Sequence, residues 1–600
     1  MKNFFKILRQ NFAIISKLYG KYLYLIPLIV ALGLVGSFSE SIGVGALVPL
    51  FSRIVKIAAP VEIDSVTRAV EKIFSVLHLE LNIYMILAFI SAMFLFKAVS
   101  GILISYISLK IKLEAEHLMR QELYSKMLAS RWPYLSQQKF GYLQGTIWVD
   151  VAASSSFLQT FTTMMIDFLS VLVYIGFSFF ISPLFSLMTL FLGGAVLVFS
   201  KPLYRRFKEA EWKTIAFEKE ISHEVNENIV GLKTIKAMNV SRRVAKIVGD
   251  IYEQYKDVKI KQQFLKNIVS GSFQPISVVF IMLVFSIYSK QPGFNFASFI
   301  SVLYLIQRSF IYLERINGNL QAINSLTPHL EHLIQTQREV EENQEEDGGI
   351  TSFAFRDSLS FKNVSFNYPN NSQAAVLRVN FSIQKGEMVG IIGPSGAGKT
   401  TVVDLLLRLL SPQEGEIVLD LTPIQDIALN EWRRSVGYVS QDTFLKNMTI
   451  GENIAFYDEA IGVGAMEEAA KMANLSDFIA GLPKGFDTVV EDRGINLSGG
   501  QRQKIVLARI LARKPKVLVL DEATSALDAE SEQEIKRTLD GLRGKVTIIV
   551  IAHRISTVLG CDTIIAFDNG QVREEGKPSE LLKDKDSYLA KVYELGLQVI

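Results

Sequence analysis

The stretch Gly393-Pro-Ser-Gly-Ala-Gly-Lys-Thr-Thr401 fits the phosphate-loop pattern, in which two glycines separated by four residues precede a lysine and a hydroxyl residue. It follows the apolar run Met388–Ile392, which predicts a buried strand, and precedes Val402–Leu410, which predicts a helix. Glycines allow backbone N–H groups to face phosphates at a helix N-terminus, where anions are favoured. Because strand, loop and helix come in the required order, the stretch predicts an α/β domain that binds a nucleoside triphosphate.

A cation and a hydroxyl group of this loop are expected to contact the phosphates and the metal ion. Lys399 is expected to reach the β- and γ-phosphates, and Thr400 to ligate Mg²⁺. The loop residues that we expect around ATP are Gly393, Ser395, Gly396, Gly398, Lys399, Thr400 and Thr401.

A second motif lies downstream, where the apolar run Val517–Leu520 is followed directly by Asp521 and Glu522. Such a run predicts a buried parallel strand, and parallel sheets bind ligands at the carboxyl ends of their strands. Acids at a strand end are often merely solvated, but here a phosphate loop precedes them. Asp521 is therefore expected in the Mg²⁺ shell, and Glu522 is expected to orient and polarise the attacking water as a general base.

A third motif is the loop Leu497-Ser498-Gly499-Gly500-Gln501, which opens a predicted helix. It has the form of a phosphate cradle, although the domain already has one for its own nucleotide. With the two motifs above, it makes the chain resemble the ATP-binding cassette family. The resemblance implies that this loop closes over ATP held by a partner domain, so that two domains enclose two nucleotides head to tail.

The other elements of the family follow in order, and their roles are those that the resemblance implies. Tyr368 matches the aromatic residue that stacks on adenine, and Gln441 the glutamine that links Mg²⁺ and water to the membrane domain. Ser525-Ala-Leu-Asp528 matches the loop that contacts the partner domain, and His553 the histidine that holds the γ-phosphate. Glu491–Gly494 matches the exporter segment that touches the partner's coupling helices.

The first half of the chain carries apolar stretches long enough to cross a membrane. One helix over all of Phe168–Ser200 would be roughly 50 Å long, against about 30 Å of hydrocarbon, so we expect a break at Ser182-Pro183. The six predicted spans are Tyr22–Phe51, Leu81–Leu109, the two halves of Phe168–Ser200, Asn267–Ser289 and Phe294–Ile316.

Loop charge predicts the orientation of these spans. Lysines and arginines gather between spans two and three and between spans four and five, whereas the turns between spans three and four and between spans five and six together hold one lysine, Lys290. Both termini and the long connections are therefore expected in the cytosol. The connections predict helices over Glu114–Ser130 and Phe207–Asn228, which extend the spans beyond the membrane. By resemblance, Arg131–Gly141 and Glu220–Lys233 are coupling segments, and the second docks on the cassette of the other subunit.

The predicted layout is therefore a six-helix membrane domain fused to an α/β phosphate-loop domain, as in exporter half-transporters. Its parts are a basic amphipathic elbow over 1–20, a membrane domain over 21–333, an acidic linker over 334–350 and a cassette over 351–600. The elbow is not expected to be a cleavable signal peptide. Outside the membrane, Val61–Leu79 predicts an amphipathic helix from the spacing of Val66, Val70, Ile73 and Leu77. It either lies on the outer membrane surface or packs on its own domain.

Charges inside the spans are candidate substrate contacts, because a charge in lipid is costly. Glu40, Lys97, Arg308 and Arg315 are the candidates for a substrate cavity, which would then be net basic and suit an anionic headgroup such as a phosphate-linked lipid. The alternative is that they face a cytosolic vestibule or snorkel to the interface, and this alternative is favoured for the pair Lys261 and Lys266.

Composition excludes some functions. The 600 residues are too many for one core, and a net charge of +3 implies no large nucleic-acid footprint. The one cysteine, Cys561, cannot form an intrachain disulfide, which fits a cytosolic domain. The spans argue against a soluble cassette ATPase of DNA repair or translation, and no cysteine-protease domain precedes the first span.

The segment Ser39–Gly45, followed by Val48-Pro49-Leu50, and the external helix resemble bacterial flippases of lipid-linked oligosaccharides. The expected function is ATP- and Mg²⁺-dependent export or flipping of an amphipathic or lipid-linked anionic molecule across a bacterial inner membrane. The intact nucleotide motifs favour a homodimer. Two alternatives stay open: a peptide or multidrug exporter, and a cassette ATPase that gates a channel.

Overall fold

The computed structural model divides the chain into two compact units, one joining 1–130 to 134–344 and the other joining 131–133 to 345–600. Each unit has hydrophobic clusters of its own. The described residues are 20, 22, 24–54, 65–76, 78, 80, 82–138, 140–181, 183, 186–189, 191, 201–289, 296–369, 373–441, 443–491, 494–521, 523, 529–552 and 555–597. The predicted elbow over 1–20 lies, except for Gly20, outside the described residues.

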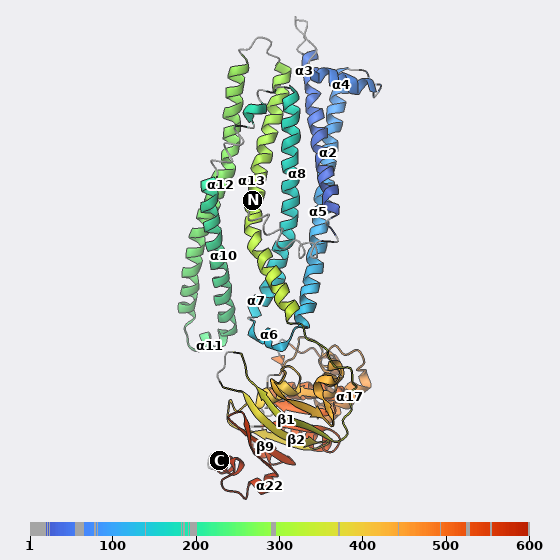
Figure 1. Cartoon of the computed structure of the whole chain (residues 1–600), viewed down its shortest axis with the longest axis vertical. Helices are drawn as coiled ribbons and strands as arrows, with labels where there is room; N and C mark the ends of the chain where they lie inside the picture. The colour runs from blue at the N-terminus through green and yellow to red at the C-terminus, as the bar shows by residue number, and fades with distance from the viewer. Residues whose placement is uncertain are drawn as a thin grey trace. The chain divides into compact units, whose positions relative to one another are not determined.

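The first unit is built of helices, several much longer than a membrane is thick (Figure 1). Helices α5, α12 and α13 contain 46, 48 and 47 residues. At 1.5 Å per residue each is about 70 Å long, against about 30 Å of hydrocarbon, so they extend beyond the membrane as predicted. The bounds are α2 Leu25–Gly45, α3 Leu47–Ile54, α4 Ser65–Val76, α5 Ile83–Leu128, α6 Trp132–Gln137, α7 Phe140–Gly145, the π-helix η1 Thr146–Asp150, α8 Val151–Ile181, α10 Lys201–Val230, α11 Leu232–Ala237, α12 Ser241–Tyr288 and α13 Phe296–Glu342.

Four helices of the described part are long and apolar enough to cross a membrane: Leu25–Phe51, Ile83–Leu128, Gly141–Ile181 and Ser241–Ile287. They contain most of the first, second, third and fifth predicted spans. Most of the predicted fourth span, after Pro183, lies outside the described residues. The predicted sixth span is helical within α13 from Phe296 onward but is not among the four.

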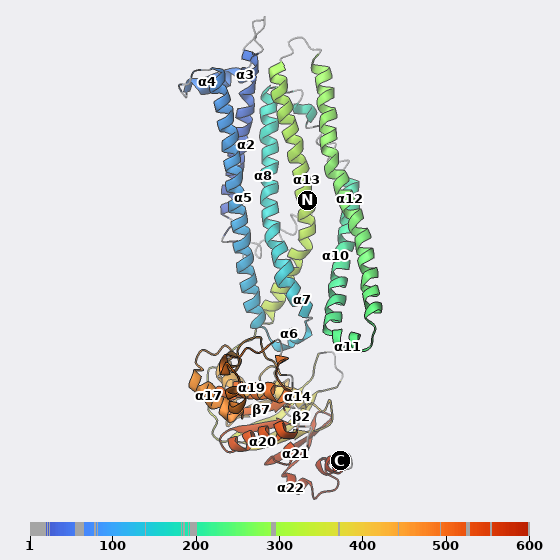
Figure 2. The same cartoon turned by 180° about the vertical axis from the view of Figure 1, so that it is seen from behind.

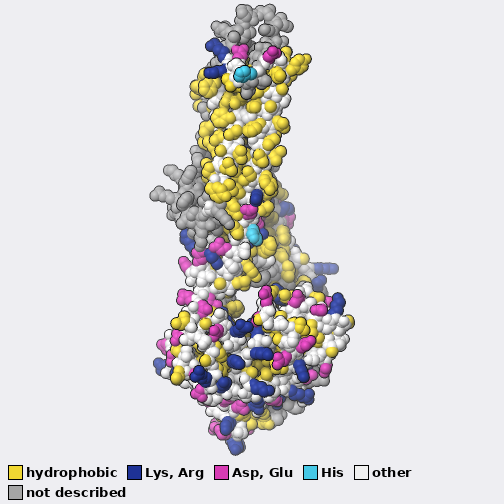
Figure 3. Space-filling view, turned by 90° about the vertical axis from the view of Figure 1, so that its right-hand side faces the viewer, with side chains coloured by type: hydrophobic (Ala, Val, Ile, Leu, Met, Phe, Trp, Pro, Cys, Tyr) yellow, Lys and Arg dark blue, Asp and Glu magenta, His cyan; other side chains and the backbone are white. Residues whose placement is uncertain are grey.

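The surface of the membrane helices matches a lipid surrounding. Large apolar side chains of α5 point outward, and Leu95, Ile102 and Tyr106 are more than 60% exposed, at 67%, 69% and 65%. Figure 3 shows this face of the first unit as an almost continuous hydrophobic surface. In water such a face would be unfavourable, so these side chains are expected to meet lipid chains.

The predicted external helix is present as α4, Ser65–Val76. Two of its apolar residues, Val70 and Phe74, are buried against Ala46, Leu50 and Ile86 of the helices beside it. The helix therefore packs on its own domain, and its place on the outer membrane surface stays a prediction.

The predicted linker over 334–350 is partly wrong, because α13 continues to Glu342. The acidic composition of this stretch concealed an apolar side. Leu333 and Val340 are both fully buried in a cluster with residues of α5 and α8. On its polar side, Glu341 Oε1 pairs with Lys126 Nζ of α5 at 2.7 Å.

The predicted coupling segments contain or adjoin short helices. The first contains all of α6. The second, 220–233, lies mostly in α10, and the short helix α11 begins only at Leu232.

The second unit contains a four-stranded sheet of order β2-β1-β4-β5 and a six-stranded sheet of order β10-β9-β3-β8-β7-β6. In the larger sheet, the five strands β9, β3, β8, β7 and β6 run parallel, and β10 pairs with β9 antiparallel. Strand bounds are β1 Ser358–Phe366, β2 Val376–Gln384, β3 Met388–Ile392, β4 Glu414–Leu419, β5 Thr422–Pro423, β6 Val436–Val439, β7 Val517–Asp521, β8 Thr547–Ile551, β9 Thr563–Asp568 and β10 Gln571–Gly576.

Alternating side chains of the parallel strands fill two separate cores, as a pleated strand requires. Leu518 and Leu520 of β7 belong to one hydrophobic cluster, and Val517 and Val519 to the other. Figure 2 shows the helices of this unit from behind, with α17 and α19 near each other. The helices are α14 Lys399–Leu406, the 3₁₀ helix η2 Ile424–Asp426, α15 Leu429–Ser435, α16 Ile450–Ala455, α17 Val463–Met472, α18 Ser476–Ala480, the 3₁₀ helix η3 Gly485–Asp487, α19 Gly499–Ala512, α20 Ala529–Leu542, α21 Ile555–Val558, α22 Pro578–Leu581 and α23 Tyr588–Leu597.

Candidate nucleotide site and intramembrane charge cluster

The phosphate loop connects β3 to α14, as predicted, and its conformation requires glycine. Gly398 caps α14 with φ 99°. A Cβ at this position would lie 2.4 Å from the carbonyl oxygen of Ala375. Gly393, with φ 149°, would place a Cβ 2.3 Å from the carbonyl oxygen of Phe567. Larger residues would therefore clash with backbone at both ends of the loop.

A buried cation lies across this loop. Lys399 is 6% exposed, and its Nζ donates to the carbonyl oxygens of Gly393 and Pro394, both at 2.9 Å. Beside it, Thr400 is exposed and Thr401 is buried. Hydroxyl groups of Tyr368 and Thr401 lie 3.3 Å apart, so the predicted adenine-stacking residue does lie against the first turn of α14. Ser395 and Gly396 are exposed at the loop tip.

Acidic groups converge beside the loop at the end of β7. Asp521 is 6% exposed, and Tyr438 Oη donates to its Oδ2 at 3.3 Å. Burial, together with the negative charge of Asp521, raises the pKa of Asp404 in α14 to about 6. Sequence reasoning missed Asp404, whose only signal is a single acid in the apolar helix that follows the loop.

The predicted residues gather because their strands are neighbours. The phosphate loop follows β3, Asp521 ends β7, and Gln441 follows β6 and is exposed. Since β6 pairs with β7 and both run parallel to β3, their carboxyl ends meet at one edge of the sheet. The predicted residues Glu522, Ser525, Asp528 and His553 lie outside the described residues.

The third motif forms a capped helix start. Ser498 Oγ accepts from the backbone N–H of Gln501 at 3.2 Å, and Gln501 Oε1 accepts from the N–H of Ser498 at 2.8 Å. This reciprocal capping box fixes the first turn of α19. Gly499 and the buried Gly500 form the start of this turn, where the positive pole of the helix dipole lies. Leu497, partly buried, packs against the cassette core.

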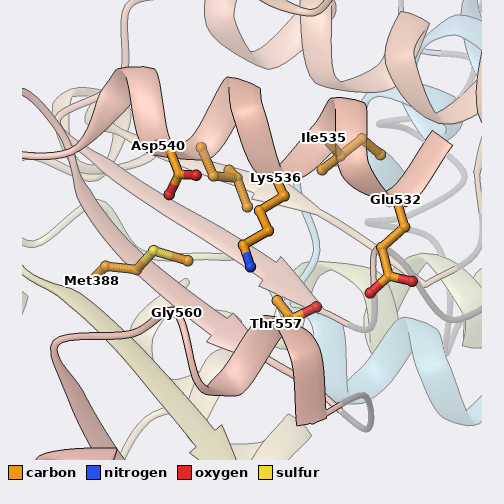
Figure 4. Close-up of a pocket in the computed structure, with 8 residues that line it drawn as sticks. Met388, Glu532, Ile535, Lys536, Asp540, Thr557 and Gly560 are labelled. Atoms are coloured by element: carbon orange, nitrogen blue, oxygen red, sulfur yellow. The ribbon is translucent and has the colours of Figure 1, made fainter. Parts of the chain in front are cut away.

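A small pocket lies elsewhere in the cassette, between α20, α21 and the start of β3. Lys536 points into it between Met388 and Thr557 (Figure 4). None of the motif residues lines it, so we assign it no part in nucleotide binding.

In the membrane unit, one buried acid gathers the predicted charges. The Glu40 side chain is 2% exposed and pairs with Arg308 Nε at 2.8 Å and Lys97 Nζ at 3.9 Å. Two hydroxyl groups also donate to it, Tyr174 Oη at 2.5 Å and Tyr304 Oη at 2.8 Å. Lys97 and Arg308 therefore already have an acidic partner within the chain. The sequence analysis expected an anionic headgroup near these cations and did not predict their pairing with Glu40.

A second buried acid, Asp167 of α8, was missed from the sequence, although it interrupts an apolar stretch. Its side chain is 1% exposed and lies 3.4 Å from Arg315 Nη2. Asn319 Nδ2 also donates to it, at 2.9 Å. The remaining predicted pair, Lys261 and Lys266, is exposed on α12 and belongs to neither group.

Glu40, Lys97, Asp167, Arg308 and Arg315 form what we call the intramembrane charge cluster. Its acids and cations differ in exposure. The acids are 2% and 1% exposed, whereas Lys97, Arg308 and Arg315 are 25%, 35% and 52% exposed. Three cations and two acids leave one positive charge in excess. The accessible side of the cluster is therefore cationic and rests on buried carboxylates.

Comparisons with known proteins match both units. A family profile described as ABC transporter transmembrane region matches residues 34–307, and one described as ABC transporter matches residues 376–525. A protein of Burkholderia orbicola named ATP-dependent lipid A-core flippase is 30% identical over 506 residues, which cover 82% of each chain. A protein of Nostoc sp. named Heterocyst differentiation ATP-binding protein HepA is 29% identical over 474 residues, or 78% of this chain and 77% of that one.

A solved structure, described as a bacterial Atm1-family ABC exporter with ATP bound, covers 96% of this chain and 98% of its own. Its TM-score is 0.77 at 22% identity. At this identity the likeness concerns the fold, which is that of an exporter with a helical membrane domain and a nucleotide-binding domain.

Proposed function

The chain belongs to the ABC transporter family as a multi-pass membrane ATPase coupled to transport, and we propose that it moves an anionic amphipathic or lipid-linked molecule across a bacterial inner membrane. Relatives of about 30% identity named lipid A-core flippases support a lipid-linked substrate. We also propose the full exporter layout of six spans, with the fourth after Pro183 and the sixth in the first half of α13.

The observation that carries the substrate class is the arrangement of the intramembrane charge cluster. A charge that faced lipid alone would cost at least about 2.5 kcal/mol on insertion scales. The exposed parts of Lys97, Arg308 and Arg315 therefore need water or a ligand, and the excess positive charge selects an anion. Tyr304 and Tyr312 support the cations, with the Arg308 and Arg315 guanidinium carbons 5.2 and 5.1 Å from their ring centres. We infer that the cations line the substrate path.

ATP is the energy source that the family implies, and the residues of the nucleotide site fit it. The loop leaves no room for a Cβ at Gly393 or Gly398. The buried Lys399 amine lies where a triphosphate would supply oxygen acceptors in place of two carbonyls. We propose that Thr400, Gln441 and Asp521 hold Mg²⁺, which neutralises phosphate charge. Glu522 would orient and polarise the attacking water, and His553 would hold the γ-phosphate.

A homodimer supplies what one chain lacks for this chemistry. The capped loop Leu497–Gln501 would close on ATP bound to the partner, and the 525–528 segment would contact it. Apolar side chains at the tip formed by α10, α11 and α12 support contact with a second subunit. Ile229, Val230, Leu232 and Met238 are 64%, 82%, 52% and 67% exposed there. We propose that this tip docks on the partner's cassette.

The composite site can be tested with a mixed dimer. A Ser498→Arg subunit and a Lys399→Ala subunit together retain one intact site, so the mixed dimer should hydrolyse ATP when neither mutant homodimer does. Hydrolysis no faster than that of the homodimers would contradict the head-to-tail arrangement.

The substrate class can be tested in proteoliposomes with fluorescent lipids of negative or zero headgroup charge. The variant Lys97→Gln/Arg315→Gln leaves the Glu40–Arg308 pair intact and lowers the positive charge of the path. It should keep basal ATPase activity and lose about tenfold in the flipping of anionic lipid, the loss expected for one charged hydrogen bond. The control Lys261→Gln/Lys266→Gln removes the same charge from exposed positions on α12. Equal flipping of anionic lipid by wild type and the first variant would refute the anionic substrate, and transport of peptides alone would favour the peptide exporter.

A further inference from the structure

Arg509 is a buried cation that none of the nucleotide motifs contains. It lies on α19, the helix that the loop Leu497–Gln501 opens, and it is 7% exposed. Burial lowers the pKa of its guanidinium to about 10, so the group remains charged at neutral pH. A buried charge is costly unless it is fully bonded, so the contacts of this side chain indicate what it holds in place.

The guanidinium joins α19 to two other segments. Its Nε donates to the carbonyl oxygen of Asn453 in α16 at 2.7 Å, and its Nη2 to Asn453 Oδ1 at 3.2 Å. Its Nη1 donates to the carbonyl oxygen of Phe444 at 2.9 Å, in the segment that follows Gln441. One side chain therefore ties the signature helix to α16 and to the segment after Gln441.

Asn453 completes the connection. It is fully buried, and its Nδ2 donates to the carbonyl oxygens of Lys446 at 3.0 Å and Thr449 at 3.1 Å. Its Oδ1 accepts from the N–H of Lys446 at 3.1 Å. The backbone from Phe444 to Thr449 is thus held by an asparagine that Arg509 itself holds.

A strained turn supports the same guanidinium. Phe456 and Tyr457 are consecutive residues with positive φ, 40° and 64°, a conformation that costs energy in a residue with a Cβ. The Phe456 ring lies beneath Arg509, with the guanidinium carbon 4.2 Å from the ring centre. The contact between the Phe456 ring and the buried cation offsets part of the energy that this backbone conformation costs.

We propose that Arg509 is a positioning residue that makes the signature helix and the segment after Gln441 move as one body. It touches neither the phosphate loop nor Tyr368, so its loss should spare ATP binding and impair the closure that hydrolysis requires. The inference rests on the proposed action of Ser498 on the partner's ATP, and not on the identity of the substrate. The mixed dimer tests that action separately, so the two can fail independently.

The test compares Arg509→Met, Arg509→Lys and Arg513→Met in the purified full-length protein. Arg513 is the matched control, since it caps the C-terminus of α19 four residues after Arg509. Among the described residues it donates a hydrogen bond to the Phe456 carbonyl oxygen alone, at 3.4 Å, with Asp458 3.8 Å away. ATPase assays give kcat and the KM for ATP, thermal unfolding reports folding, and hydrogen exchange reports the backbone amides of 445–448.

For Arg509→Met we expect kcat to fall at least about tenfold, the size of one lost charged hydrogen bond, with KM for ATP unchanged within about twofold. Exchange at 445–448 should become faster while the phosphate loop stays as in wild type. Arg509→Lys should recover only part of kcat, because a single ammonium cannot reproduce the planar fork. Arg513→Met should stay within about twofold of wild type.

The proposal is overturned if Arg509→Met keeps its kcat, if KM rises in step with the loss, or if Arg513→Met loses as much. If Arg509→Met does not fold, Phe456→Leu decides by the same measurements, because it removes only the ring beneath the guanidinium. A Phe456→Leu protein with wild-type kcat and wild-type exchange at 445–448 would then overturn the proposal.

Discussion

The cassette and the membrane unit both place charged groups away from water, but they do so by different means. In the cassette, the backbone within a few residues holds Lys399, whose amine bonds to carbonyls five and six residues before it. In the membrane unit, Glu40 bonds to Tyr174 and Tyr304, 134 and 264 residues away. A local motif can thus be identified from a short string, whereas the intramembrane charge cluster depends on how separate helices face one another.

The largest effect is expected on ATP binding and hydrolysis when Lys399, the cation held by its neighbouring backbone, is replaced. Lys399→Ala removes the only side-chain cation within the phosphate loop itself, so ATP binding and hydrolysis should both be lost, with hydrolysis falling at least about a hundredfold. Nucleotide binding and ATPase assays check this on purified protein. Glu522→Gln is the control, because it should still bind ATP while hydrolysis fails; unchanged ATP affinity in Lys399→Ala would show the loop assignment to be wrong.

The next effect concerns the long-range cluster. Glu40→Gln leaves Lys97 and Arg308 without their carboxylate, and breaking a buried ion pair costs about 3–5 kcal/mol. We expect a lower unfolding temperature in detergent, with ATP affinity unaffected.

The double variant Glu40→Gln/Arg308→Gln distinguishes the effect of an unbalanced charge from the effect of changed side-chain packing. It keeps hydrogen-bonding side chains of similar size and restores the charge balance, so it should recover part of the lost stability. Equal destabilisation in the single and double variants would show that the ion pair is not what holds these helices.

A smaller effect is expected at the more exposed pair of the cluster. Arg315→Gln affects a guanidinium that is 52% exposed, so the pair with Asp167 should contribute about 1 kcal/mol or less to stability. The unfolding temperature should fall less than in Glu40→Gln. A fall as large as that of Glu40→Gln would contradict the distinction between an accessible cation and a buried acid.

The smallest effect tests a cassette acid held by backbone. Asp420 accepts from the backbone N–H groups of Arg356, Asp357 and Ser358 at 2.8, 2.7 and 3.0 Å, and these donors lower its pKa. A lowered pKa stabilises the fold above the unfolded-state value near 4, and this stability is lost as pH falls through the folded-state value.

Asp420→Asn should therefore lower the unfolding temperature at pH 7 by an amount equivalent to about 1 kcal/mol, and the difference from wild type should shrink as the pH falls through the folded-state pKa of Asp420. Thermal unfolding at several pH values measures this. A difference that grows on acidification would have the wrong sign for the contacts described.

The amino-acid sequence alone was enough to predict the cassette, its phosphate loop, the strand end at Asp521 and the signature loop that opens a helix. Each depends on a few consecutive residues whose backbone conformation follows from glycine, capping and strand period. It also determined which stretches are apolar enough for a membrane, because that property is additive along the chain. It missed Asp404 and Asp167, single acids in apolar helices, because a lone charge gives no periodic signal.

Three features could be seen only in the folded protein: which charges pair, that α4 packs on its neighbours, and that α13 continues into the expected linker as far as Glu342. Whether Val340 of an acidic stretch is buried depends on the helices beside it. Whether Lys97 meets Glu40 depends on the rotation of α5 against α2. A helix period shows which residues share a face, but packing between segments distant in sequence decides what that face contacts. These contacts also decide whether a buried charge has a partner, and therefore what its burial costs.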